Sequence, residues 1–364
     1  MLRRTTLVQR AATPRAQLMN ASLPAVLGFP FAGPPLAAQT TEVAPGVRWL
    51  RMPLPFALDH INIWLLADGD GWTQVDCGYG DAATRALWDA HIATTLGGLP
   101  LHRVIATHFH PDHLGNAAWL TQRFGCPLFM PQAEFLTAHL VAGGAAGYDN
   151  EAVCDLFRDH GMAAGDIVAM RARGNNYRRG VPELPVAFRR IIPGDAIAID
   201  GKSWRAIGGY GHSPEHVALH CEQLGICISG DMLLPRISTN VSVGPAERDG
   251  NPLARFLASI DAFRAMAPDT LVLPSHGLPF VGAALRVAQL EAHHVARLTE
   301  LEAAVDSPRT AAELLPVLFR RELDLQQRYF AMGEAIAHLN YLWHASRLAR
   351  KIADDGTIRF ARTD

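Results

Sequence analysis

Residues 104–116, which read VIATHFHPDHLGN, carry four side chains of metal-ligating type within six positions. The first three residues are apolar and predict the end of a short buried strand. His108 and His110 follow at period-two spacing, which points them the same way in an extended chain. The proline after them predicts a loop, with Asp112 and His113 on the turn beyond. A loop at the carboxyl end of a buried strand is where α/β proteins usually place their chemistry.

Two interpretations of this cluster compete. A single histidine is more often a surface residue or a satisfied core residue than a metal ligand. Four such groups at a buried strand end are costly unless a partner satisfies them, and a cation does so. The density of the cluster therefore favours a metal site. Neutral imidazole and carboxylate ligands suit zinc, and they also suit iron or manganese.

Composition and charge limit the classes to which this protein can belong. The chain has 364 residues, of which 49% are hydrophobic, and a formal net charge of −2. This is enough apolar material for a large core, and the balanced charge predicts no polyanionic partner. Five dispersed cysteines without a Cys-x-x-Cys pair predict reduced thiols and a cytoplasmic location. No run approaches the ~20 apolar residues of a membrane span, so no membrane partner is expected.

Residues 1–40 differ from the rest of the chain. Prolines interrupt the apolar part of this segment and spoil a helical signal sequence. We predict a disordered extension or an over-long start, with a targeting signal for export as the alternative.

From residue 41 to residue 285, short strands and helices are predicted in turn. The strands are expected at 47–52, 62–67, 72–78, 104–106, 127–130, 197–200, 204–207, 217–220, 226–229 and 271–276, and the helices at 81–95, 116–124, 132–142 and 252–266. Between them, residues 143–185 contain glycine-interrupted helical pieces, which we interpret as an insertion lying over the site. Its basic side chains are more simply a solvated face than a contact for an anionic substrate group.

Three more candidate ligands lie far from the histidine loop in sequence. His212, Asp231 and His276 each follow an apolar or β-like run and stand beside a glycine. Each glycine permits a positive φ or a close backbone approach. A structural role explains each residue equally well when it is taken alone. Together with the histidine loop, however, they complete the ligand set that a two-metal site needs.

The order of these residues resembles the motif set of the metallo-β-lactamase superfamily, in the form found in glyoxalase II and its relatives. In chain order the matching residues are Asp76, His108, His110, Asp112, His113, His212, Asp231 and His276. The resemblance implies an α+β fold, an αββα sandwich of two mixed sheets with two divalent metal ions at one edge. One ion would be held by His108, His110 and His212, the other by Asp112, His113 and His276, with Asp231 bridging. Asp76 would orient a ligand histidine.

The same resemblance implies a hydrolase in which the two ions activate a shared hydroxide toward a small ester, thioester or lactone. The expected ions are zinc, with iron or manganese as alternatives, and the expected catalytic carboxylates are Asp112 and Asp231. A metal-dependent endoribonuclease is the second hypothesis. A di-iron redox protein of the same fold is a third, although such proteins typically carry a glutamate where this chain has His110. A metal-binding scaffold without activity is the remaining alternative.

Residues 286–364 form a predicted third segment after the extension (1–40) and the catalytic domain (41–285). Three helices are expected: one at 289–305, one that begins at a capping box formed by Thr310 and Glu313, and one at 331–349. A hairpin with its turn at 355–356 should follow. This arrangement is similar to the winged-helix tail of the lactamase-beta-like branch, some of whose members cut RNA. Because its charges are balanced, we expect packing or homodimer contacts rather than nucleic-acid binding. Its aromatic residues are predicted to be core: Tyr329, Phe330, Tyr341 and Trp343.

Overall fold

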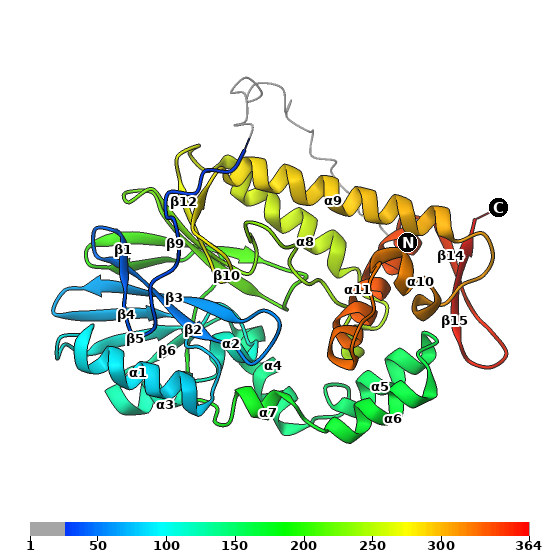
Figure 1. The fold of residues 1–364 in the computed structure, drawn as a ribbon, viewed down its shortest axis with the longest axis horizontal. Helices are drawn as coiled ribbons and strands as arrows, with labels where there is room; N and C mark the ends of the chain where they lie inside the picture. The colour runs from blue at the N-terminus through cyan, green and yellow to red at the C-terminus, as the bar shows by residue number, and fades with distance from the viewer. Residues whose placement is uncertain (1–25, 364) are drawn as a thin grey trace, which may run out of the picture.

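The computed structural model describes residues 26–363, in which two mixed β-sheets lie face to face with helices on both outer sides (Figure 1). The first sheet runs in the order β1 (Thr41–Ala44), β2 (Val47–Pro53), β3 (His60–Asp68), β4 (Gly71–Val75), β5 (Leu101–Ile105), β6 (Leu128–Met130) and β7 (Arg189–Arg190). The second sheet runs in the order β13 (Phe280–Val281), β12 (Leu271–Pro274), β11 (Ile226–Gly230), β10 (His216–Cys221), β9 (Lys202–Gly209) and β8 (Ala196–Ile199). Both sheets combine parallel and antiparallel pairs, as the αββα prediction requires.

Three apolar cores separate the four layers. The core between the sheets is built around Trp49, Trp64 and Trp204, each at most 1% exposed. Strands buried on both faces read as continuous apolar runs, which is why β3 and β11 were recognisable in the sequence. The edge strand β8 instead alternates exposed and buried residues, because one face meets solvent.

Helices close the sandwich on each side. A second core joins the first sheet to α1 (Ala82–Thr94), α3 (Ala117–Phe124) and α4 (Gln132–Gly143). On the other side lie α8 (Pro252–Ile260) and α9 (Ala283–Ala304), as Figure 1 shows. The segment 143–185 is helical over much of its length, forming α5 (Asn150–Asp159), α6 (Ala164–Arg173) and α7 (Tyr177–Gly180).

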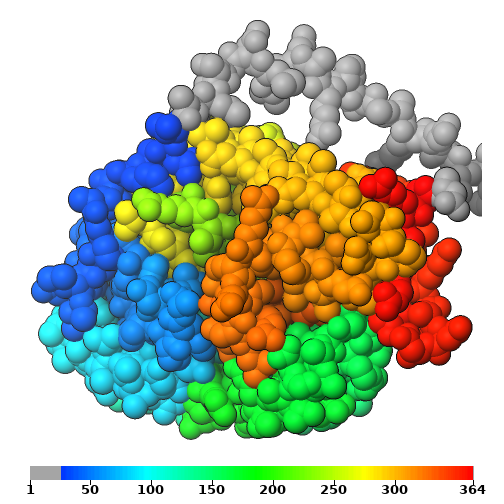
Figure 2. Space-filling model, turned by 45° about the vertical axis from the view of Figure 1, so that its right-hand side comes forward, coloured from blue at the N-terminus to red at the C-terminus, as the bar shows by residue number. Residues whose placement is uncertain are grey.

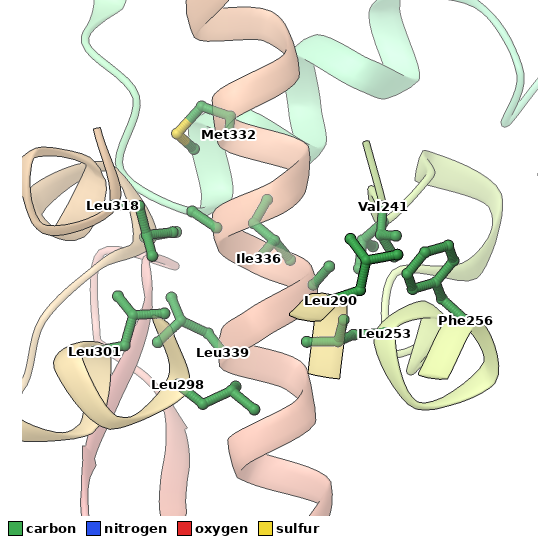
Figure 3. Close-up of a cluster of buried hydrophobic side chains, with 14 of the residues drawn as sticks. Val241, Leu253, Phe256, Leu290, Leu298, Leu301, Leu318, Met332, Ile336 and Leu339 are labelled. Carbon is green, nitrogen blue, oxygen red and sulfur yellow. The ribbon is translucent and has the colours of Figure 1, made fainter. Parts of the chain in front are cut away.

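The C-terminal elements share the third core with the second sheet. They are α10 (Ala311–Leu318), α11 (Leu325–His344), β14 (Leu348–Ile352) and β15 (Ile358–Arg362), and the predicted capping box opens α10. In Figure 3, Ile336 and Leu339 of α11 meet Leu253 of α8 and Leu290 of α9 in one cluster. Figure 2 shows the orange C-terminal residues directly against the green segment that contains α5 and α6. The predicted boundary at residue 286 falls inside α9.

Two expectations need correction. Tyr329 and Phe330 are not core residues, since they remain 38% and 46% exposed. They lie near the start of α11, where the fully buried residues begin only at Ala331, so their helical spacing does not bury them. Tyr341 and Trp343, further along, do pack against the core.

The second correction concerns the segment before residue 41. Gly28 exchanges two backbone hydrogen bonds with Val281, at 3.1 and 2.8 Å, and Phe31 packs edge-on against Trp49. Residues 28–31 therefore pack against both sheets of the sandwich, through Val281 of β13 and Trp49 of β2. Residues 1–25 of the predicted extension lie outside the described residues. Within residues 26–363, no helix combines the length and the apolar character needed to cross a bilayer.

A buried histidine pair in the third core makes folding sensitive to acid. His338 Nδ1 donates to the Glu334 carbonyl at 2.9 Å, so its Nε2 accepts from His294 Nδ1 at 3.1 Å, and both rings are neutral. Burial lowers the pKa of His294 to about 3 and that of His338 to about 4. Their stabilisation is present above the unfolded-state pKa near 6.5 and is lost as the pH falls toward the folded-state values.

We expect the free energy of unfolding to fall by about 4 kcal/mol between pH 7 and pH 5 from this pair, about 2 kcal/mol for each ring. Urea unfolding at both pH values measures this loss. The double variant His294→Leu/His338→Leu should show a correspondingly smaller loss. If the free energy of unfolding fell equally between pH 7 and pH 5 in the wild type and the double variant, His294 and His338 would not be the source of the acid sensitivity.

Candidate metal centre

Five chain segments bring ligand-type side chains to one edge of the sandwich. Each follows the carboxyl end of a strand or connects two strands at that edge. Asp76 follows β4, the histidine loop follows β5, His212 lies between β9 and β10, Asp231 follows β11 and His276 lies just beyond β12. The structure therefore brings together all seven predicted ligands and Asp76.

The histidine loop differs from the prediction in one detail. Pro111 starts a one-turn helix, α2 (Pro111–Leu114), where a loop was expected. Proline is favoured at this first helical position because its missing N–H has no partner there in any helix. The helical turn carries Asp112 and His113 away from the direction of His108 and His110, as the prediction of a second set of ligands requires.

The first cluster contains three converging imidazoles and a carboxylate. His108 Nε2 lies 2.9 Å from His110 Nδ1 and 3.1 Å from His212 Nε2, and Asp231 Oδ2 lies 3.3 Å from His212 Nε2. Burial and the neighbouring rings lower the pKa of His108 and of His110 well below the ordinary histidine value. Neutral imidazoles whose lone pairs converge in this way are suited to hold a cation.

The second cluster contains two imidazoles and two carboxylates. Asp112 Oδ2 lies 3.5 Å from His113 Nε2 and 3.4 Å from His276 Nε2. Asp231 Oδ1 lies 3.6 Å from His113 Nε2 and 3.4 Å from His276 Nε2. The two oxygens of Asp231 thus face different clusters, one each.

The buried polar atoms of this centre fit a metal ion. Among the described residues, His113 Nε2 and Asp231 Oδ1 are fully buried and have no hydrogen-bond partner. Buried polar atoms are normally satisfied, so these two atoms lack the group that completes them. Burial lowers the pKa of His113, but three nearby carboxylates outweigh it and raise the pKa to about 10. The electrostatic field of the centre therefore favours positive charge at this position.

In four of the five histidines, Nδ1 bonds to a group outside the clusters and Nε2 is directed into the centre. The Nδ1 partners are Thr107 Oγ1 for His108 (3.0 Å), Asp76 Oδ2 for His113 (2.8 Å), the Asn240 carbonyl for His212 (2.7 Å) and the His60 carbonyl for His276 (2.8 Å). Partners of this kind fix ring orientation and select the tautomer that presents Nε2. Asn240 contributes through its backbone, not its side chain.

Asp76 holds two segments of the centre at once. It is fully buried, its Oδ1 accepts from Thr107 N at 2.8 Å, and its Oδ2 accepts from His113 Nδ1. The residue has a φ of 60°, a conformation that aspartate and asparagine tolerate better than most residues. Asparagine therefore tests the chemistry of this position with little change in backbone strain.

In the Asp76→Asn variant, we expect metal affinity to fall about 10- to 100-fold. The amide can accept from either His113 or Thr107, but its NH₂ group then faces the other donor. Competition with a chromophoric chelator measures the change. Wild-type affinity in the variant would show that Asp76 does not orient His113.

Sequence reasoning missed three residues that support the centre. Thr107 bridges Asp76 and His108, Glu134 of α4 accepts three hydrogen bonds from the ligand loops, and His216 Nε2 accepts from Asp231 N at 3.2 Å. A Cβ at Gly230, whose φ is +54°, would lie 2.2 Å from His216 Nε2, so the close packing needs glycine there. Thr107 directly precedes the candidate ligand His108, and His216 lies four residues after His212, so their positions in the sequence provided a signal. Nothing in the sequence around Glu134 indicates its role.

Other residues considered from the sequence have structural partners. Tyr177 donates to the Phe109 carbonyl at 2.6 Å, and Arg171 pairs with Glu151 at 2.8 Å. Cys77 is fully buried and all five cysteines are free, as expected. Ser213, which follows the candidate ligand His212, donates its hydroxyl to Glu134 Oε1 at 2.7 Å.

The αββα sandwich with its His/Asp clusters at one edge, together with relatives named as hydrolases, places the protein among the metal-dependent hydrolases. The family model of the metallo-beta-lactamase superfamily matches residues 57–276, and that of a metallo-beta-lactamase-like C-terminal domain matches residues 298–363. The chain belongs to the metallo-β-lactamase superfamily, which confirms the resemblance inferred from the motifs.

Two solved structures and two curated relatives show the extent of the similarity. A beta-lactamase domain protein from Burkholderia ambifaria is 50% identical with a TM-score of 0.87, covering 93% of this chain and 98% of its own. A metallo-beta-lactamase family protein from Thermus thermophilus is 30% identical with a TM-score of 0.74, covering 88% and 100%. The probable metallo-hydrolase YqjP of Bacillus subtilis is 24% identical over 319 residues, covering 80% and 91%. A hydroxyacylglutathione hydrolase of Thiobacillus denitrificans is 28% identical over 294 residues, covering 78% and 89%.

Proposed function

We propose that this protein is a dinuclear metal-dependent hydrolase of a small ester, thioester or lactone. The observation that carries the proposal is the division of the Asp231 carboxylate, whose Oδ2 faces His212 while its Oδ1 faces His113 and His276. A carboxylate in this position could serve two ions at once, which His108, His110 and His212 would hold on one side and Asp112, His113 and His276 on the other.

Two bound divalent ions would lower the pKa of water toward neutrality and stabilise negative charge developing on a substrate oxygen. The groups that bond to Nδ1 keep the ligand histidines in the tautomer that presents Nε2 to a metal ion. Asp231 spans the two clusters, and Asp112 presents Oδ2 to the second cluster while its side chain is 18% exposed. Asp112 is therefore the proposed proton acceptor with access to solvent, and Asp231 the proposed bridging carboxylate. Zinc is the proposed ion, with iron and manganese as alternatives, because the donor set suits all three.

The C-terminal hairpin supports a small-molecule substrate over RNA. Its arginines are engaged by acceptors within the chain: Arg347 with Glu302, Arg350 with Asp249, Arg359 with Glu313 and Arg362 with the Val305 carbonyl. A nucleic-acid surface needs cationic groups that are free to meet phosphates. The relative named hydroxyacylglutathione hydrolase adds an acylglutathione thioester to the substrates worth testing.

Elemental analysis of the purified protein, followed by a panel of thioesters, lactones, simple esters and single-stranded RNA, tests the proposal. We expect two metal ions per chain and metal-dependent turnover of a small acyl substrate. Turnover without metal would overturn the proposed mechanism. Cleavage of RNA alone, with binding that weakens steeply as salt rises, would establish the nuclease alternative instead.

A further inference from the structure

Glu134 is a buried carboxylate to which the proposed mechanism assigns no step. It lies in the first turn of α4 and is 0% exposed. Three groups donate to it: Phe109 N to Oε2 at 2.9 Å, Ser213 Oγ to Oε1 at 2.7 Å and Glu215 N to Oε1 at 2.6 Å. These three donors favour the ionised form of the carboxylate, against the burial that disfavours it.

The donors belong to the two loops that supply the first metal cluster. Phe109 stands between His108 and His110, so its amide is part of the chain that connects these two ligands. Ser213 directly follows His212. One carboxylate therefore joins segments that are about a hundred residues apart in sequence, at the point where their imidazoles converge.

The negative charge of Glu134 has no cationic side chain beside it. Within the described residues, no arginine or lysine forms an ion pair with it, and burial raises its pKa to about 7 against the hydrogen bonds that lower it. Burying a carboxylate without a counter-charge is costly. A divalent ion in the adjacent cluster would supply positive charge close to it, and His212 already interacts with it electrostatically.

We propose that Glu134 is a positioning residue that fixes the His108–His110 loop relative to His212 and thereby sets the affinity of the first cluster for its ion. The inference rests on the proposed function, since it presupposes that this cluster holds a metal. Glu134 touches neither the second cluster nor its ligands. Its loss should therefore weaken one ion and spare the other, which general destabilisation of the fold would not do.

Two variants remove this link to different extents. In Glu134→Gln, the single amide oxygen cannot serve all three donors, because the NH₂ group must face Phe109 N or Glu215 N. Ser213→Ala removes one donor and leaves the carboxylate and both backbone bonds intact. Glu222→Gln makes the same chemical change on a side chain that is 79% exposed and serves as the matched control.

Zinc affinity of each site, measured by chelator competition on the full chain, is the main readout. Thermal unfolding of the metal-free protein and the visible spectrum of the cobalt-substituted protein accompany it. For Glu134→Gln we expect one of the two sites to weaken about 10- to 100-fold with the other unchanged. The cobalt spectrum of the weakened site should also change. Ser213→Ala should show a smaller loss at the same site, and Glu222→Gln should match the wild type.

Three results would overturn the inference. The first is wild-type affinity at both sites in Glu134→Gln, and the second is equal weakening of both sites. The third applies if Glu134→Gln does not fold: in that case, wild-type zinc affinity of both sites in Ser213→Ala would overturn the inference. A wild-type protein that binds no ion overturns the proposed function together with this inference. Two tightly bound ions in both wild type and Glu134→Gln overturn the role of Glu134 alone.

Discussion

Replacement of Asp231 by asparagine should lower turnover by about 10³-fold, the largest effect expected of any single substitution in this protein. The side chain keeps its size, so the sandwich should remain folded. The amide keeps only one oxygen, however, so one of the two clusters faces an NH₂ group where the wild type presents a carboxylate oxygen, 3.3 Å from His212 or 3.4 Å from His276. Two divalent ions held close together also lose the negative charge that offsets their mutual repulsion.

Metal content by mass spectrometry and kcat/KM on the best substrate of the panel measure this result together. Asp354→Asn, on the exposed C-terminal hairpin, is the control for loss of one carboxylate charge. A variant at position 231 that retains two ions and more than about a tenth of the wild-type turnover would contradict the proposed bridging role, because the expected loss is about 10³-fold.

Removal of the metal ions should abolish turnover reversibly and lower the melting temperature. At an ion concentration about 1,000 times the dissociation constant, binding at one site stabilises the folded state by about 4 kcal/mol, which corresponds to a shift of about 5 °C in a chain of this size. The apolar cores do not include the ligands, so the metal-free protein should still unfold cooperatively.

Dialysis against dipicolinate, followed by a thermal scan and an assay, gives both quantities. Restoring zinc, manganese or iron(II) separately then shows which ion supports turnover. Full activity and an unchanged melting temperature after complete removal of metal would be incompatible with a metal-dependent hydrolase.

The strands and the histidine loop could be predicted because their signals are local. An apolar run such as residues 226–229 predicts a buried strand wherever it occurs in the chain. The strand β11 agrees with that range to within one residue. A capping box is equally local, and Thr310 and Glu313 form the predicted one. The residue types that bind metals can also be read directly from the sequence. For this reason, eight residues were enough to identify the resemblance to the superfamily.

Burial of particular side chains was harder to predict, because it depends on what covers an element. Tyr329 and Phe330 have helical spacing suited to a core, yet the fully buried part of α11 begins only after them, at Ala331. The proline-rich segment before residue 41 has no regular pattern, yet Gly28 and Phe31 find partners at Val281 and Trp49. In both cases the deciding neighbour is far away in sequence.

The sequence by itself marks the histidine loop as a candidate metal site, because four ligand-type side chains in six positions have few other uses, and the resemblance to the superfamily implies the other candidate ligands and the class of chemistry. Only the tertiary structure decides that Asp231 turns one oxygen to each cluster and that Glu134 joins the two histidine-bearing loops. The physical reason is that these contacts are fixed by how the two sheets pack and where their strands end. A glutamate in the first turn of a helix is favourable there in any case, so sequence alone gives it no distinguishing mark.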